Sequence, residues 1–175
     1  MTIIVRRARC GDLTDVARLL AETWHATYDD WLGSDRVREI TRAWHGPGQL
    51  AAQAEASQAV FLVAQAGAQA GTAFADMAGT AFAHMDGTAQ AEIGRLYVHP
   101  RWQGRGIGGM LLEGVMAAMP DIARFHLDVD PRNTRAIAFY THHGFAVTGR
   151  GDDGGGEGSG LEHLVMERIV TVPRR

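Results

Sequence analysis

A glycine-rich segment constrains the fold more than any other part of this sequence. It reads VHPRWQGRGIGGMLL from Val98 to Leu112, between a predicted strand and a predicted helix. Glycines let a ligand approach the backbone closely, and the free N–H groups of a helix N-terminus favour an anion. The segment therefore predicts a strand–helix junction that binds phosphate, with an empty tight turn as the alternative.

Two overlapping patterns in this segment point to different phosphate ligands. One is GxGxxG from Gly104, the dinucleotide-binding fingerprint, with Asp128 at the place of its ribose acid. In that fingerprint the first glycine follows the strand almost directly, whereas His99–Gln103 intervenes here. The fingerprint also expects a parallel βαβ unit, but strands in hairpin order precede this one. An NAD-binding Rossmann domain is therefore disfavoured. The second pattern, QxxGxG from Gln103, is favoured instead.

Composition excludes several classes of protein. The 175 residues are 46% hydrophobic and 21% charged, with a net charge of -3, so no basic field predicts nucleic-acid or anionic-membrane binding. Basic residues cluster in the sequence at Arg95, Arg101 and Arg105, and of these Arg101 and Arg105 add positive charge near the glycines. The single cysteine, Cys10, rules out an intrachain disulfide framework and is expected to be a small buried hydrophobe.

The sequence predicts one cytoplasmic domain over residues 1–175 without a metal site. The N-terminal apolar run is too short for a signal peptide, and no stretch approaches a membrane span. The eight histidines show no recurring ligand spacing.

Periodicity predicts a mixed α/β order rather than a uniform βαβ array. A strand over Ile3–Ala8 precedes a helix capped by Asp12, and the later elements are helices over Asp35–Trp44 and Gln49–Ala56, strands from Val60 and over Ala91–Val98, a helix over Ile107–Met119, a strand over Phe125–Val129, a helix from Asn133 to His143, and strands over Phe145–Thr148 and Leu161–Val170.

Two segments leave the arrangement of strands open. An octad recurs from Gly71, Gly79 and Gly87, which we interpret as a local duplication in a β-meander with a hairpin at Asp86–Gly87. The duplication either lengthens a strand or inserts a hairpin. The acidic, glycine-rich stretch 149–160 is expected to be a mobile loop.

The chain resembles the GCN5-related N-acetyltransferase (GNAT) superfamily. Two segments carry the resemblance, LYVHPRWQGRGIGGMLL with QxxGxG after a strand, and NTRAIAFYTHHGF from Asn133. The resemblance is detailed over Glu92–Phe145 and topological elsewhere. It implies a mixed, mostly antiparallel sheet flanked by helices, with two splayed central strands that match Ala91–Val98 and Phe125–Val129.

The resemblance also implies acetyl-CoA as cofactor and assigns residues to it. The pantetheine arm would pair with the main chain of Leu96, Tyr97 and Val98. The pyrophosphate would lie on the amides of Gln103, Gly104, Arg105, Gly106, Ile107 and Gly108. Asn133 would contact the cofactor while capping its helix, and one face of that helix, with Ala136, Phe139, Tyr140 and His143, would turn toward it.

Tyr140 and Glu92 are the candidate catalytic residues. A phenol with a pKa near 10 can protonate a thiolate whose acid has a pKa of about 8.5, and the family uses the tyrosine that matches Tyr140 in this way. A core ring with a hydrogen-bonded hydroxyl is the alternative. Glu92 lies where some members carry a general-base glutamate that deprotonates the amine, whereas other members use water.

The acceptor pocket of this fold is built by the first helices and the last hairpin. That would place Trp24, Tyr28, Trp31 and the loop with Asp152 and Asp153 near a cationic amine, although packing aromatics and a solvated loop explain the same residues. The strands carry three further candidates for the acceptor side, His84, Asp128 and His163.

The sequence therefore predicts an acetyl-CoA-dependent N-acetyltransferase that acts on a primary amine of a small molecule or amino-acid-like acceptor. Two alternatives stay open: acetylation of a protein lysine or N-terminus, and a non-catalytic CoA-binding module. The family's frequent dimers make a homodimer an open expectation.

Overall fold

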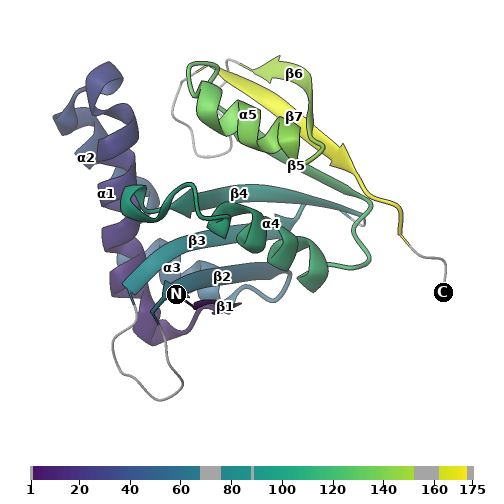
Figure 1. Cartoon of the computed structure of the whole chain (residues 1–175), viewed down its shortest axis with the longest axis horizontal. Helices are drawn as coiled ribbons and strands as arrows, with labels where there is room; N and C mark the ends of the chain where they lie inside the picture. The colour runs from purple at the N-terminus through teal and green to yellow at the C-terminus, as the bar shows by residue number, and fades with distance from the viewer. Residues whose placement is uncertain (1, 68–75, 88, 152–161, 173–175) are drawn as a thin grey trace. The chain divides into compact units, whose positions relative to one another are not determined.

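The structure, a computed structural model, describes residues 2–67, 76–87, 89–151 and 162–172. Its strands form a seven-stranded mixed sheet in the order β1-β2-β3-β4-β5-β7-β6, with helices packed on it (Figure 1). This confirms the mixed α/β class and the mostly antiparallel sheet. The chain divides into two compact units: unit 1 holds Met1–Phe82 and Arg95–Ala118, and unit 2 holds Ala83–Gly94 and Met119–Arg175.

Unit 1 carries the N-terminal strands and most of the helices. Its elements are β1 (Ile3–Arg7), the 3₁₀ turn η1 (Cys10–Asp12), α1 (Leu13–Leu32), α2 (Ser34–Trp44), α3 (Pro47–Glu55), β2 (Ala59–Ala66), most of β3 (Asp76–Met85), the end of β4 (Gln90–Val98), the 3₁₀ turn η2 (Pro100–Trp102) and α4 (Ile107–Ala118). The predicted helices are all present, and their bounds differ only at the ends.

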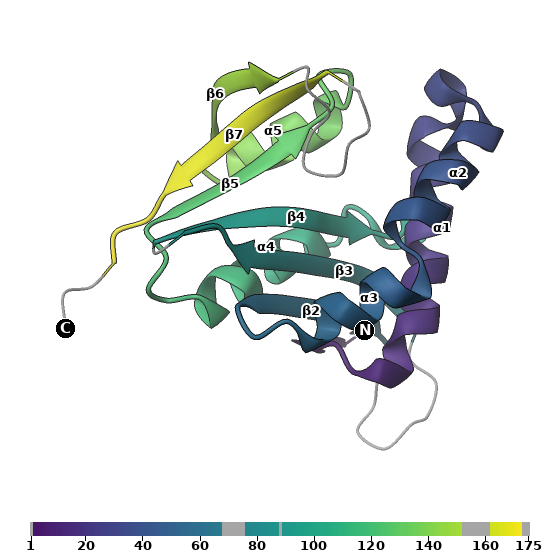
Figure 2. The same ribbon diagram turned by 180° about the vertical axis from the view of Figure 1, so that it is seen from behind.

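Helices cover both faces of the strands in unit 1. Figures 1 and 2 show α4 in front of β2 and β3 in one view, and α3 in front of them in the reverse view. Alternation along β2 explains this, because successive side chains point to opposite faces. Phe61 and Val63 join the core cluster with Leu19 and Leu20 of α1, whereas the side chain of Leu62 lies against α4 at Gly114.

Unit 2 consists of the end of β3, the start of β4, β5 (Arg124–Val129), α5 (Thr134–His142), β6 (Ala146–Gly151) and β7 (His163–Ile169). Strand β5 is parallel to β4 and antiparallel to β7, and β7 is antiparallel to β6. The Leu161 end of the last predicted strand and the tip of the predicted mobile loop lie outside the described residues.

Within the described residues, the octads from Gly79 and Gly87 do not fold as structural repeats. Gly79 lies inside β3, where a Cβ would approach both Tyr97 O and Leu111 Cδ1 to 2.9 Å. Gly87 instead lies in the predicted turn between β3 and β4, with φ of 114°, and Asp86 N donates to Gln90 O across that turn. Gly71 lies outside the described residues. The hairpin prediction is confirmed, and Gly79 and Gly87 have unrelated roles.

The turn between β1 and α1 corrects two expectations. Cys10 is exposed in η1, so the prediction of a buried cysteine is wrong, because this short turn lies at the surface. Asp12 precedes α1 as predicted but makes no side-chain cap. Its carboxylate instead accepts hydrogen bonds of 2.7 Å from both terminal nitrogens of Arg6 and from Arg9 N. The bidentate pair fastens β1 to the start of α1.

No helix within the described parts of the chain is both long enough and apolar enough to cross a bilayer.

Replacing Asp12 with Asn should destabilise the protein by about 1–2 kcal/mol at neutral pH, because a charge-assisted bidentate pair is lost. The hydrogen bond from Arg6 lowers the pKa of Asp12 below its ordinary value of 3.8. A lowered pKa stabilises the fold above the ordinary pKa, and this stabilisation is lost as pH falls through the lowered one. The free energy of urea unfolding should therefore be lower for Asp12→Asn than for wild type at neutral pH, and this difference should disappear in acid. The control Asp15→Asn removes an exposed pair with Arg18 and should change the free energy little.

Candidate active site

The glycine segment follows β4 through a fixed turn in unit 1. Trp102 N donates to His99 O at 2.8 Å, and Gln103 N donates to Pro100 O at 3.3 Å, which closes η2. The Gln103 side-chain amide donates to Val98 O at 2.9 Å. The sequence predicts that Gln103 binds phosphate, yet its main-chain N–H and its side-chain amide already have acceptors within the turn.

Gly104 and Gly106 hold the conformation that an anion-binding loop needs. Their φ angles are 74° and 78°, in the left-handed region that side chains with a Cβ rarely adopt. Both residues are exposed, and no atom lies within 4 Å of the position a Cβ would take. Helix α4 begins directly after them at Ile107, where the first amides have no intrahelical acceptor. These residues fit a diphosphate such as that of coenzyme A.

Two of the three clustered arginines lie beside this loop, and the third does not. The guanidinium carbons of Arg101 and Arg105 lie 5.2 and 5.1 Å from the ring centroid of Trp102. Arg95 is instead 4% exposed, with its guanidinium carbon over Phe61 at 4.9 Å. Arg95 therefore adds no charge beside the loop, because its side chain points into the core.

Helix α5 of unit 2 carries the second set of predicted residues. Asn133 caps this helix as predicted, since its side-chain oxygen accepts from Ala136 N at 3.1 Å. Phe139 and His143 lie on one helical face with ring centroids 4.6 Å apart. At the other end, Arg168 of β7 donates to His143 O at 2.8 Å, which suits the negative end of the helix dipole.

Tyr140 is nearly buried between neighbouring rings. It is 8% exposed, and its ring centroid lies 5.1 Å from that of Phe139 and 5.5 Å from that of Phe145. The chain turns sharply after it, because Phe145 N donates to Tyr140 O at 3.0 Å around Gly144. Both ends of α5 are fixed, so the Tyr140 side chain projects from a rigid support.

Glu92 lies on a polar face of the strands in unit 2. It pairs in register with His126 of β5, and its Oε2 lies 3.7 Å from His84 Nε2. The Glu92 side chain is 26% exposed, so it is half-buried as a candidate base requires. Asp128 lies two residues beyond His126 on the same face, with its Oδ2 3.6 Å from His163 Nε2. The structure thus gathers His84, Asp128 and His163 on the polar strand face that carries Glu92.

The backbone ladder between β4 and β5 is short. The register pairs Gln90–Glu92 with Arg124–His126, and among the described residues it ends there. Strand β4 nevertheless continues to Val98, through Leu96, Tyr97 and Val98, whose pairing with pantetheine stays a prediction. The described residues contain no group of three or more side chains placed to hold a metal ion.

The aromatic residues of α1 that were expected near the acceptor are largely core residues. Trp24 and Tyr28 are 6% and 8% exposed and pack with Val37 and Ile40 of α2, whereas Trp31 is 39% exposed. Burial favours the packing explanation for the first two, and acceptor contact stays a prediction. Asp152 and Asp153 lie outside the described residues.

Comparison with known proteins decides the family. Residues 16–145 match the acetyltransferase (GNAT) family model, which spans both predicted cofactor segments. The chain belongs to the GNAT acetyltransferase family. This confirms the resemblance drawn from the two motifs, and acetyl-CoA is the donor that the family uses.

Two solved acetyltransferases share the fold. The PaiA N-acetyltransferase of Thermoplasma acidophilum, determined in complex with coenzyme A, aligns with a TM-score of 0.81 and 24% identity over 97% of this chain and 100% of that one. The ribosomal-protein-S18-alanine N-acetyltransferase of Escherichia coli aligns with a TM-score of 0.71 and 18% identity over 99% and 97%. At these identities the likeness shows the fold.

A curated relative matches a shorter stretch of the chain. The peptidyl-lysine N-acetyltransferase YjaB of Salmonella typhimurium is 39% identical over 57 residues. That stretch covers 33% of this chain and 37% of the relative's length.

One buried polar side chain in unit 1, His45, was not predicted from the sequence. His45 follows α2, is 7% exposed, and has neither ring nitrogen hydrogen-bonded; its ring lies 6.0 Å from that of Trp24. Burial, and then the charge of Arg95, lowers the pKa of His45 to about 3. Local sequence carries no signal for this, because the environment of His45 comes from distant elements.

His45 should make the fold sensitive to acid. Unfolded His45 protonates below pH about 6.5, whereas the folded ring stays neutral down to about pH 3, so the unfolded state binds more protons between these values. Stability should fall as pH decreases through this window, by up to about 1.4 kcal/mol per pH unit from this group.

The free energy of unfolding, measured with denaturant between pH 7 and 4, should depend less steeply on pH for His45→Phe than for wild type. The control His142→Gln changes an exposed histidine at the end of α5 and should retain the wild-type slope. If the unfolding free energies of His45→Phe and wild type fell equally steeply with pH, His45 would not be the source of the acid sensitivity.

Proposed function

We propose that this chain transfers the acetyl group of acetyl-CoA directly to the primary amine of a small-molecule or amino-acid-like acceptor. One observation carries the proposal. The exposed left-handed glycines Gly104 and Gly106 precede the N-terminus of α4 in a chain of the acetyltransferase family. When bound, acetyl-CoA supplies an acetyl group activated as a thioester.

The loop amides from Gly104 to Gly108 would hold the diphosphate of the donor. The first-turn amides of α4 add the positive end of the helix dipole, and the exposed Arg105 adds a charge beside them. The main chain of Leu96–Val98 would hold the pantetheine arm, and cofactor contact by Asn133, Ala136, Phe139 and His143 of α5 stays a prediction from the family resemblance. Of these residues, Asn133 also has a structural role as the cap.

Glu92 would act as general base. An amine acceptor is protonated at neutral pH and must lose one proton before it can attack. The Glu92 carboxylate, half-buried on the polar strand face of unit 2, can accept that proton directly or through water. The neighbouring His84 and His126 keep this part of the face polar.

Tyr140 would act as general acid by holding a proton at its Oη for the departing sulfur. A phenol ordinarily titrates near 10 and a thiol near 8.5, so the proton transfer is uphill by only about 1.5 pKa units, about 2 kcal/mol. The acylated nitrogen then returns a proton to Tyr140. The balance per turnover is one proton released to solvent, one acetyl group moved and one thiol formed.

A protein acceptor is the second candidate. The local likeness to a peptidyl-lysine N-acetyltransferase favours it, because such enzymes acetylate a side-chain amine. Thiol release from acetyl-CoA, measured across matched panels of free amines, amino acids and lysine-containing peptides, separates the two. Release only with peptides would replace the small-molecule acceptor, and tight CoA binding without release would indicate a binding module.

Tyr140→Phe should lower kcat about a hundredfold or more, because the phenolic proton is lost while the ring and its packing remain. Binding of CoA, measured by calorimetry, and the thermal unfolding midpoint should both stay near the wild-type values. A wild-type rate across the pH range would contradict the acid role.

Glu92→Gln should lower kcat/KM about tenfold or more at neutral pH, and the deficit should shrink as pH rises, because the free amine then forms without a base. Glu167→Gln is a matched control, since Glu167 pairs in register with His126 from the other side. Its rate should match wild type at every pH. An equal deficit in both variants would indicate a general effect of charge.

A further inference from the structure

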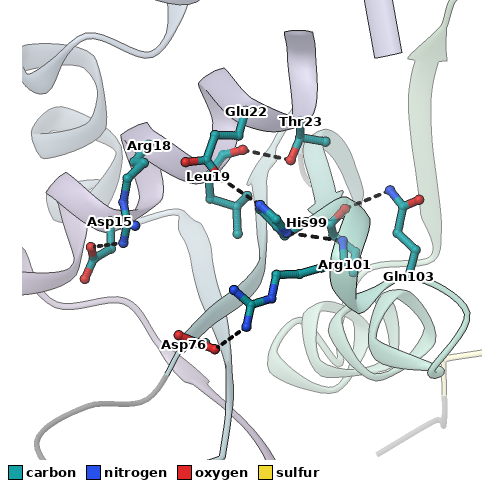
Figure 3. A network of polar contacts seen from close by, with 10 residues as sticks. Asp15, Arg18, Leu19, Glu22, Thr23, Asp76, His99, Arg101 and Gln103 are labelled. Atoms are coloured by element: carbon teal, nitrogen blue, oxygen red, sulfur yellow. Dashed lines mark hydrogen bonds and ion pairs between the residues drawn. The ribbon is translucent and has the colours of Figure 1, made fainter. Parts of the chain in front are cut away.

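The turn His99–Gln103, which leads into the glycine loop, is held by side chains from separate elements of unit 1. Figure 3 shows these contacts, with α1 on one side and β3 on the other. His99 Nε2 lies 2.7 Å from Glu22 Oε2 of α1, although 77 residues separate the two in sequence. Arg101 donates to Asp76 at the start of β3 at 3.0 Å.

The His99 ring uses both nitrogens. Arg101 N donates to Nδ1 at 3.3 Å, so His99 is the side-chain cap of η2. With Nδ1 accepting, the ring proton lies on Nε2, which donates to Glu22. The His99 side chain therefore caps the turn through Nδ1 and links the turn to α1 through Nε2. Its backbone is fixed as well, since His99 N donates to Ala78 O of β3 at 2.9 Å.

We propose that Glu22 and His99 are positioning residues that set the affinity for the diphosphate of coenzyme A by fixing the turn that presents the loop amides. The inference rests on the proposed function of that loop. The physical reason is preorganisation. The loop from Gly104 to Gly108 holds three glycines, which lose the most conformational entropy on ordering, so an unanchored loop would bind the diphosphate more weakly.

The structure favours a positioning role over a merely stabilising one. The Glu22 side chain is 50% exposed, and exposed pairs contribute little to global stability. The His99 side chain, which receives this pair, is 21% exposed and lies four residues before Gln103, whose side chain returns to Val98 O. Loss of the pair should therefore loosen the turn while leaving the core of unit 1 intact.

The test compares two acetyl donors, acetyl-CoA and S-acetylpantetheine, which lacks the diphosphate. In Glu22→Gln and His99→Ala, KM for acetyl-CoA should rise about tenfold with kcat nearly unchanged, as expected for loss of a charge-assisted contact that orders a binding loop. For S-acetylpantetheine, kcat/KM should equal the wild-type value. Calorimetry with CoA should show the same loss of affinity.

Two further variants test whether the loss of CoA affinity arises from the contacts of His99. His99→Asn keeps a side-chain acceptor for Arg101 N and should lose less affinity than His99→Ala. The Glu22→Gln/His99→Ala double variant should lose no more than His99→Ala, because both changes remove one pair. The control Arg36→Gln breaks an exposed pair with Glu39 on α2 and should leave the kinetics with both donors unchanged.

The outcomes separate this inference from the proposed function. If wild type does not bind CoA, the proposed function fails. If wild type binds CoA and the variants bind it equally well, the positioning role fails while the function stands. An equal loss with both donors, or a lowered unfolding midpoint that accounts for the loss, also overturns the positioning role.

Discussion

The parallel ladder between β4 and β5 covers Gln90–Glu92, and the placement of the candidate site residues depends on this short pairing. Its last pair fixes Glu92 in register with His126, on the polar strand face. Beyond it, β4 continues as a strand of unit 1 to Val98 and delivers the chain to the glycine loop. One strand therefore carries the candidate base near one end and the donor-binding segment at the other.

What sequence predicted well was local. The cap at Asn133, the start of α4 at Ile107 and the hairpin near Gly87 each depend on a few consecutive residues, and each is present. The family motif was readable for the same reason, because its glycines act through φ angles that their own positions require. Strand and helix order followed from hydrophobic period.

What sequence could not predict was set by distant contacts. Arg95 reads as one of three clustered basic residues, yet side chains from β2 and β3 enclose it. Trp24 reads equally well as a pocket residue or a core residue, and only the packing of α2 decides its burial. The pair of Glu22 and His99 has no sequence signal, since neither residue type at its own position predicts a partner 77 residues away.

The division of site residues between the two compact units has an evolutionary consequence. The loop from Gly104 and its anchors belong to unit 1, whereas Glu92, Tyr140 and the histidine-lined face belong to unit 2. Substitutions in separate cores are close to additive, so drift in one unit leaves the other's architecture available to selection. Substitutions on the strand face that carries Glu92 can therefore accumulate while the loop from Gly104 and its anchors at Glu22 and His99 are inherited unchanged.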